Sequence, residues 1–284
     1  MRTNNERLAQ NMRQYEQAEA VCLRPDMPVV IRVDGRAFKH FTKGLKTPFD
    51  DVFRAVMRRT AQDLCAAVPD CIIGYTFSDE ISLIVFPGNQ DEPSRWFGYN
   101  TQKLASHTAS MATLYFNRYF SEIVEQLVDF LEHNQDISPR GKAEKYPSQY
   151  IHCLQQKLWT ATFDSRAFSL PLTELLEYLR FRQMDCVRNS VSAAARAELG
   201  KAASLWKNKS IGEMVDMLEA TNRPWDSYTS QEKYGAFCVK VPHNFEKEVN
   251  GQVVHFVRNK WVVLSETPKL PQELQNLSQY FPAI

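Results

Sequence analysis

Two segments of the chain place acidic residues directly after apolar runs, where carboxylates are poor choices for packing. Asp34-Gly35 follows the run 28–33, and Ser78-Asp79-Glu80 follows the run 71–77. Carboxylates are suitable ligands for hard cations such as Mg²⁺. A glycine after an aspartate also lets the backbone approach a ligand closely. The two segments therefore predict one shared metal site at the ends of strands.

A shared site of this kind predicts nucleotidyl chemistry. Two Mg²⁺ ions about 4 Å apart can activate an attacking hydroxyl and stabilise a leaving phosphate in an in-line displacement. Aspartates on neighbouring strands and one backbone carbonyl can hold both ions while substrate phosphates complete the coordination. Cyclases and polymerases share this logic. The alternative for each segment is a tight turn with a solvated carboxylate, although two acids without Gly or Asn are unusual in a hairpin turn.

A cluster of basic side chains surrounds the first acid, interleaved with Phe38, His40 and Phe41. This composition favours neutralising a triphosphate, with an aromatic ring near the base. In the alternative, the segment is a solvated basic loop that Phe38 and Phe41 anchor to the core. The basic cluster comprises Arg32, Arg36, Lys39, Lys43 and Lys46.

The segment 183–199 is predicted to be a helix with one polar and one apolar flank, because its polar residues and its apolar residues each recur at spacings of three and four. The polar flank can contact phosphate or RNA, although such a stripe is more often simply the solvated face of a helix. Further basic candidates are Arg166, Arg180, Arg182, Lys207, Lys209 and Lys233. The polar flank consists of Asp185, Arg188, Asn189, Ser192 and Arg196.

The elements that must position these residues alternate between strand and helix. The first half predicts strands at about 28–33, 71–77 and 81–86, with one helix that Asp50 or Asp51 caps and another from about 94 to 132. This order is typical of an α+β fold with a polymerase-palm-like (ferredoxin-like) antiparallel sheet and flanking helices. Further on, 158–163 predicts one more strand, and 171–199 predicts helices in a mostly helical C-terminal region.

Composition limits the classes of protein that remain. Hydrophobic residues make up 44% of the 284 positions, enough for a substantial core and against disorder. The net charge of +1 means that affinity for nucleic acid must come from local basic patches. Six cysteines form no CxxC pair, which indicates reduced core thiols rather than a zinc site. We see no signal peptide and no bilayer-long apolar run, and we expect a cytoplasmic protein.

Several motifs also occur at a recognisable spacing. The motifs are residues 31–38, Pro48 and residues 78–82. Asp34 and Asp79 lie 45 positions apart (79 − 34 = 45), with a predicted helix between them. With residues 183–186 and 233–235, these motifs resemble the tRNA(His) guanylyltransferase superfamily over about 28–240. The resemblance implies that Asp34, the Gly35 carbonyl and Asp79 bind two Mg²⁺ ions, and that Glu80 supports this catalytic site.

The resemblance also implies substrates and partners. ATP or GTP would activate a tRNA 5′-monophosphate, and the 3′-hydroxyl of an incoming nucleotide would then attack the activated end. Members are typically tetramers, which implies a homotetramer here. The implied nucleotide-binding residues are Asp34, Gly35, Arg36, Ala37, Phe38, Lys39, Ser78 and Asp79. The implied tRNA- or phosphate-binding residues are Arg32, Lys46, Arg188, Asn189, Ser192, Lys209 and Lys233.

On this basis the chain divides at the aperiodic segment 133–150. Residues 1–135 are expected to form the palm-like catalytic region with the metal site. Residues 136–284 are expected to hold the remaining sheet strand and a helical tRNA-binding region, packed with the first part as one extended catalytic unit.

Departures from the eukaryotic pattern indicate a branch of the superfamily. Residues 187–193 stand where eukaryotic members carry His-Ile-Asn-Asn-Leu-Tyr-Asn, and their Arg-Asn-Ser version resembles bacterial guanylyltransferase-like proteins. Those proteins repair 5′-truncated tRNAs, so our hypothesis is a template-dependent 3′–5′ nucleotidyltransferase. The alternatives are addition of G at position −1 of tRNA(His), a nucleotide or diguanylate cyclase, and an RNA-binding protein with a vestigial palm.

Overall fold

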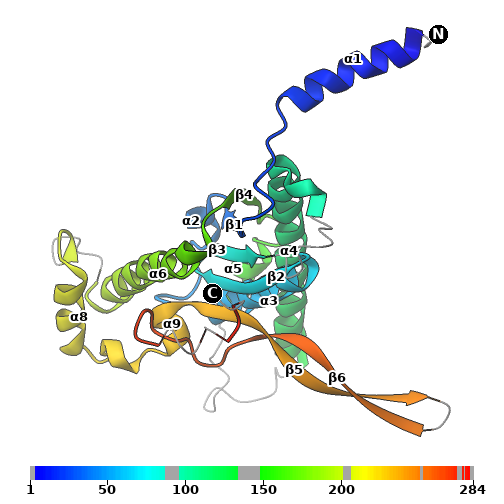
Figure 1. The fold of residues 1–284 in the computed structure, drawn as a ribbon. Helices are drawn as coiled ribbons and strands as arrows, with labels where there is room; N and C mark the ends of the chain where they lie inside the picture. Colours follow the sequence, from blue (N-terminus) through cyan, green and yellow to red (C-terminus); the bar gives the residue numbers. More distant parts are fainter. Residues whose placement is uncertain are drawn as a thin grey trace.

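A single antiparallel sheet organises the protein in the computed structural model, with strand order β4–β1–β3–β2–β5–β6 (Figure 1). The structure describes residues 4–86, 96–133, 148–200, 206–249, 252–273, 277 and 279–281. The strands are β1 (Val29–Gly35), β2 (Cys71–Phe77), β3 (Glu80–Val85), β4 (Phe163–Ser169), β5 (Ala236–Val249) and β6 (Gln252–Val263).

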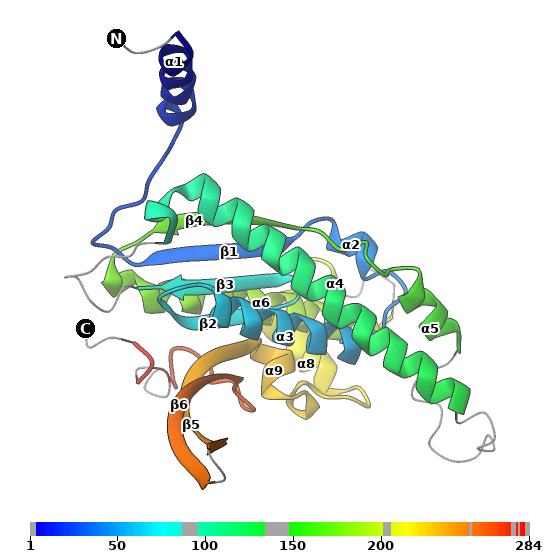
Figure 2. The same cartoon turned by 90° about the vertical axis from the view of Figure 1, so that its right-hand side faces the viewer.

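Helices cover both faces of this sheet. Helices α3 and α4 pack on one face, and α6 packs on the other (Figures 1 and 2). The predicted α+β fold with an antiparallel sheet is therefore confirmed. The helices are α1 (Asn4–Ala18), α2 (Phe38–Phe41), α3 (Asp51–Ala67), α4 (Thr101–His133), α5 (Ser148–Gln155), α6 (Leu175–Glu198), α8 (Ile211–Glu219) and α9 (Ser230–Tyr234).

Burial on both faces explains why the central strands read as continuous apolar runs. In β1, Val29, Ile31 and Val33 enter the core beneath α3 and α4, whereas Val30 enters the core beneath α6. Every second residue of a strand lies on the same face, so Arg32 and Asp34 lie on the α6 side with Val30. The polar end of β1 therefore points towards α6.

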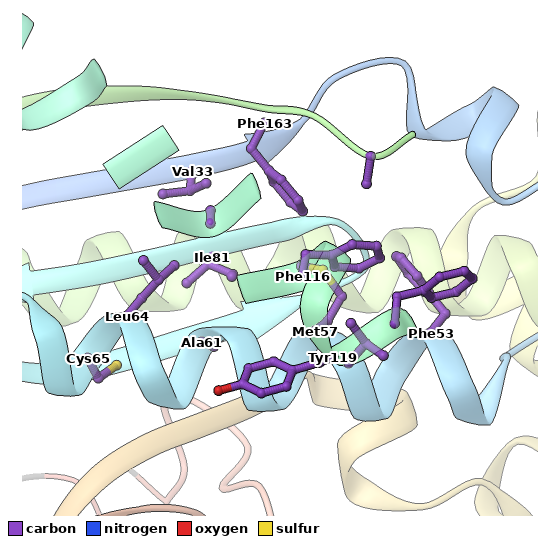
Figure 3. Close-up of a cluster of buried hydrophobic side chains, with 14 of the residues drawn as sticks. Val33, Phe53, Met57, Ala61, Leu64, Cys65, Ile81, Phe116, Tyr119 and Phe163 are labelled. Carbon is purple, nitrogen blue, oxygen red and sulfur yellow. The ribbon is translucent and has the colours of Figure 1, made fainter. Parts of the chain in front are cut away.

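An aromatic cluster anchors the segment that follows β1. The ring of Phe38 lies 5.0 Å from those of Phe41 and Phe163, and 5.5 Å from that of Phe116 (centroid distances). Figure 3 shows Phe116 and Phe163 in this core beside the apolar side of α3. Phe38 is only 3% exposed, so the core-anchor alternative is correct. The expectation of an aromatic ring near a nucleotide base stays a prediction, and the buried ring of Phe38 does not supply it.

Several predicted elements differ in extent from those observed. Asp50 caps α3 by accepting a hydrogen bond from the Phe53 amide at 2.8 Å, as expected. The predicted strand 158–163 is wrong, because 157–160 form a turn and β4 begins at Phe163. The two helices expected between 171 and 199 form one helix, α6, because no Gly or Pro interrupts it. Most of the expected loop 133–150 lies outside the described residues.

The β5–β6 hairpin is the largest element that the sequence analysis did not predict. It pairs residues 238–249 with 252–263 and extends well past the rest of the sheet (Figure 2). With β4, it gives the C-terminal half three of the six strands, so strands from both expected regions join one sheet. At the other end of the chain, α1 projects away from the body, and its described side chains are exposed (Figure 1).

The close packing of Gly35 against Phe38 leads to a stability prediction. A Cβ at position 35 would lie 2.4 Å from Cδ2 of Phe38, so Gly35→Ala must displace a core ring. We expect it to lower the free energy of unfolding by about 1–3 kcal/mol in urea denaturation. The control is Gly212→Ala in α8, where a Cβ meets nothing within 4 Å. Equal stability of the two variants would contradict the packing argument.

Candidate functional site

The fold brings the two acidic segments together at one end of the sheet. The register of β1 and β3 pairs Asp34 with Glu80. The Gly35 amide donates a hydrogen bond of 3.0 Å to the carbonyl of Asp79 in the β2–β3 turn. The charge of Asp34 contributes to raising the pKa of Asp79, so the two carboxyl groups are near each other, as a shared site requires. Metal ligation by these residues stays a prediction.

Both aspartates are held where ionisation is disfavoured. Burial raises the pKa of Asp34, and Asp164 on β4 raises it further. Burial also raises the pKa of Asp79, against a 2.8 Å hydrogen bond from the Ser78 hydroxyl. Carboxylates that share a partly buried site resist losing their protons together. A bound cation would relieve that repulsion.

Glu80 occupies a different environment from its neighbour. It is 7% exposed, and its Oε1 and Oε2 accept hydrogen bonds from Nε and Nη2 of Arg182 at 2.7 and 2.6 Å. Burial raises the pKa of Glu80, and the guanidinium acts against that shift. Arg182 also pairs with Asp185 at 3.0 Å. Both carboxylate oxygens of Glu80 are thus engaged by Arg182, and this pair links α6 to β3 at the end of the sheet where Asp34 lies.

The α6 face of the sheet changes character in successive rows across β3, β1 and β4. An apolar row is followed by a basic row and then by an acidic row at the end where Asp34 lies. The rows are Ile84–Val30–Phe168, Ser82–Arg32–Arg166 and Glu80–Asp34–Asp164.

Asp164 is a site residue that the sequence analysis missed, and Arg166 was named there only as one of several further basic candidates. Asp164-Ser165-Arg166 repeats the alternation of Arg32-Val33-Asp34 in reverse, and this period of two was the available signal. The Nε of Arg32 is buried without a hydrogen-bond partner. Like charges facing each other across antiparallel strands are destabilising, so two arginines beside the aspartates suit an anionic group such as phosphate.

A cavity of about 600 Å³ is lined in part by Ser78, which precedes Asp79 in the chain, although neither aspartate is among its described lining residues. Its walls come from the segment before α3, the start of α3, the β2–β3 turn and α6, and they include Lys46, Ser78, Asn189 and Arg196. Phe53 and Met57 add apolar surface. This volume is in the usual range of small-molecule sites.

The predicted nucleotide-binding residues lie around this end of the sheet. Arg36, Ala37 and Lys39 are exposed just after β1, and Ser78 is exposed in the β2–β3 turn. Phe38 can offer only its backbone, because its ring is buried. The structure thus groups the set, and its role in binding stays a prediction.

The predicted tRNA-binding residues are not gathered in one place. Arg32 lies beside Asp34, and Lys46 and Asn189 line the cavity. The other cationic members are engaged elsewhere: Arg188 with Asp185, Lys209 with Glu213 at 2.9 Å, and Lys233 with Asp226 at 3.6 Å. The hydroxyl of Ser192 donates to the Arg188 carbonyl at 2.7 Å. Their contacts with tRNA stay predictions.

Two negative findings apply to the described part of the chain. No group of three or more His, Cys, Asp or Glu side chains is arranged there to hold a metal ion. No helix there is long and apolar enough to span a membrane.

Comparisons with known proteins identify the family. A family model described as tRNAHis guanylyltransferase (Thg1) matches residues 9–171. The chain belongs to this family. Its members are nucleotidyltransferases, so the predicted resemblance and enzyme class are confirmed. Membership gives no support to the cyclase alternative.

Solved structures of similar proteins extend over nearly the whole chain. A bacterial tRNA(His) guanylyltransferase (Thg1)-like protein in complex with ATP is 30% identical with a TM-score of 0.69, covering 96% of this chain and 97% of its own. One in complex with GTP is 28% identical with the same TM-score, covering 96% and 98%. The tRNA(His) guanylyltransferase from Saccharomyces cerevisiae shares the fold, with 20% identity, a TM-score of 0.60, and 80% of this chain and 90% of its own covered.

Curated relatives are more distant and longer. The tRNA(His) guanylyltransferase 1 of Arabidopsis thaliana is 23% identical over 77% of this chain and 32% of its own length. The probable tRNA(His) guanylyltransferase of Dictyostelium discoideum is 29% identical over 57% of this chain and 52% of its own length. The chain thus spans between a third and a half of these relatives.

The buried Glu80–Arg182 pair generates a test by double-mutant cycle. Arg182→Met leaves a carboxylate buried without its partner, and we expect it to lower the free energy of unfolding by about 3–5 kcal/mol. Combining it with Glu80→Gln should recover much of that loss, because no unpaired charge remains. The control, Arg180→Met, removes only an exposed pair with Glu177 and should change stability by about 0–1 kcal/mol. Similar losses for Arg182→Met and Arg180→Met would refute this role.

The raised pKa values of the aspartates predict a gain of stability on neutralisation. A carboxyl with a raised pKa in the folded state binds more protons there, so its contribution to stability falls as pH rises above the unfolded value of about 3.8. In EDTA near pH 7, Asp34→Asn and Asp79→Asn should therefore raise Tm, with the gain vanishing below pH 3.8.

Added Mg²⁺ should make the unmodified protein the one with the higher Tm, because the ion should raise its Tm more than that of Asp34→Asn or Asp79→Asn. Asp26→Asn, which removes an exposed carboxylate paired with Arg24, is the matched control. Lower Tm for both site variants in EDTA would contradict the electrostatic account.

Proposed function

We propose that this chain is a template-dependent 3′–5′ nucleotidyltransferase that adds nucleotides to the 5′ end of truncated tRNA. The observation that carries the proposal is the placement of Asp34 and Asp79 together, beside paired arginines and a cavity large enough for a nucleoside. ATP or GTP would first activate the 5′-monophosphate, and an incoming nucleoside triphosphate would then supply the attacking 3′-hydroxyl.

The residues present fit Mg²⁺. Asp34 and Asp79 offer carboxylate oxygens, and the adjoining Gly35 carbonyl offers a third hard donor without any nitrogen or sulfur ligand. Burial raises the pKa of both carboxyls, and a neighbouring carboxylate adds to each shift; a divalent cation would offset both effects. When bound, two ions would activate the attacking hydroxyl and stabilise the leaving phosphate. Phosphate oxygens of the substrates would complete the coordination.

Different side chains would contact the phosphates and the nucleoside of the substrate. Arg32 and Arg166 occupy the row next to the aspartates, where two guanidinium groups can neutralise phosphate and orient it. The cavity beside Ser78 offers Phe53 and Met57 as apolar walls, with Lys46 and Arg196 as cations. This arrangement suits a nucleoside triphosphate whose phosphates face the aspartates.

Two kinds of similarity support the proposal. The similar bacterial proteins are described in complex with ATP and with GTP. In addition, residues 187–193 of α6 depart from the eukaryotic motif at Arg188 and Ser190, and Ser190 lines the cavity. The second candidate function is addition of G at position −1 of tRNA(His), which the names of the curated relatives favour.

The direct test incubates the protein with labelled, 5′-truncated tRNA, Mg²⁺ and the four nucleoside triphosphates, omitting one at a time. We expect extension only when the nucleotide complementary to the opposing acceptor-stem base is present. Asp34→Ala and Asp79→Ala should each reduce the rate roughly a thousandfold, because metal stabilisation of the transition state contributes several kcal/mol.

Asp26→Ala, at an exposed position, is the control and should extend tRNA at the normal rate. Near-normal rates in either site variant would refute the metal assignment. Addition of G alone, and only to tRNA(His), would select the second candidate function. Cyclic nucleotide formed without RNA would overturn both.

A further inference from the structure

A second pocket lies on the other side of the segment that follows Asp34. It has a volume of about 500 Å³ and opens between α2 and residues 156–162, the segment that joins α5 to β4. None of its described lining residues belongs to the larger cavity beside Ser78. The site assigned above to the nucleoside triphosphate therefore leaves this second pocket without an occupant.

The pocket is basic. Arg36, His40 and Lys157 line it, and no acidic residue is among its described lining residues. Within the described parts of the chain, none of these three side chains forms an ion pair with a carboxylate. Cations gathered without counter-charges favour an anionic ligand, because ligand charge then replaces the missing partners.

The pocket is held rigidly and close to the aspartates. The Arg36 amide donates a 2.9 Å hydrogen bond to the Thr162 carbonyl, which ties its two walls together. Buried Asn117 on α4 donates to the Ala161 carbonyl at 2.9 Å and accepts from the Ala161 amide at 3.3 Å. Arg36 lies only two residues from Asp34, a span of about 7 Å along extended backbone.

Trp159 lies in the chain between Lys157 and Thr160, which line this pocket, and its backbone conformation is one that its residue type disfavours. It is the third residue of a turn closed by a 3.2 Å hydrogen bond from the Thr160 amide to the Lys157 carbonyl, and its φ is +60°. Glycine or asparagine usually takes such a position. The indole is nevertheless 63% exposed and has no aromatic or cationic partner among the described residues. Strain of this kind often marks a binding position.

An exposed aromatic residue close in the chain to cations that lack acidic partners is a composition found in sites for single-stranded nucleic acid, although Lys157 also lies over the Phe41 ring, 5.6 Å from its centroid. The cations follow the backbone phosphates, and a base stacks on the ring. Base-paired RNA would not expose a base face to an indole. We propose that the pocket and Trp159 bind an unpaired stretch of the RNA substrate next to its reacting end, with phosphates at Arg36, His40 and Lys157 and one base stacked on Trp159. This inference rests on the proposed function only in taking RNA as the substrate.

Equilibrium binding without catalysis tests the proposal. A fluorescent, 5′-phosphorylated single-stranded RNA octamer is titrated with protein in EDTA without nucleoside triphosphates, and anisotropy gives Kd. We expect Trp159→Ala to weaken binding about tenfold and Trp159→Phe to weaken it less, because a smaller ring still stacks. Lys157→Ala should lower the slope of log K against log salt by roughly 0.7, as expected for one lost phosphate contact on a single strand.

Two variants serve as matched controls. Tyr15→Ala removes an exposed ring from α1, and Lys103→Ala removes an exposed charge near the start of α4, away from α5 (Figure 2). Both should bind the octamer as the unmodified protein does. Unlabelled single strands should displace the probe, whereas blunt duplex RNA or GTP at the same concentration should not.

Unchanged binding by Trp159→Ala, or equal displacement by duplex RNA or GTP, would overturn the inference. This failure is distinguishable from failure of the proposed function. If the unmodified protein extends tRNA but binding does not depend on Trp159, only the inference fails. If binding depends on Trp159 but tRNA is not extended, the RNA site stands and the proposed polymerase activity falls.

Discussion

Two aspartates of like charge are held together where the central strands of a buried sheet end, and much of the surrounding structure serves to hold them there. The bond from the Gly35 amide to the Asp79 carbonyl fixes one strand end against the other. Each acid would be more stable apart and in water, as the raised pKa values of both show. The protein therefore gives up local stability in a place where chemistry benefits from it.

The rest of the sheet is packed well enough to offset the cost of holding Asp34 and Asp79 together. The apolar cores on both faces provide the stabilisation, and the Glu80–Arg182 pair secures α6 over the site. Glycine at position 35 allows the Phe38 ring to pack directly beneath the acidic end. The residues nearest the chemistry are thus supported by side chains that do not face the substrate.

The charge pattern on the α6 side also gives the site a direction. Moving along β1 from Val30 to Arg32 to Asp34, the surface changes from apolar to basic to acidic. In the proposed function, a substrate phosphate would meet guanidinium groups in one row and carboxylate oxygens in the next. The larger cavity and the basic pocket are lined by different segments, so the two proposed substrates would have separate approaches.

The sequence was most informative where the signal is local. Acids after apolar runs located Asp34 and Asp79, and a capping residue located the start of α3, because each depends on neighbours in the chain. Asp164 escaped notice because its relevance comes from the β1–β4 register, which joins residues 130 positions apart (164 − 34 = 130). The β5–β6 hairpin escaped because Pro242 and interspersed charges weaken a strand pattern. Arg182 appeared only as one of several basic residues, since its pairing with Glu80 requires α6 to be placed on the sheet.

The central claim is that Asp34 and Asp79 together hold the cations used in nucleotidyl transfer. Crystals of the protein grown with Mn²⁺ and a non-hydrolysable nucleoside triphosphate would test it through anomalous scattering from the metal. We predict manganese peaks within bonding distance of both aspartate carboxylates, shared with phosphate oxygens, while Glu80 keeps its contact with Arg182. Manganese bound elsewhere, or triphosphate bound away from both aspartates, would contradict the account.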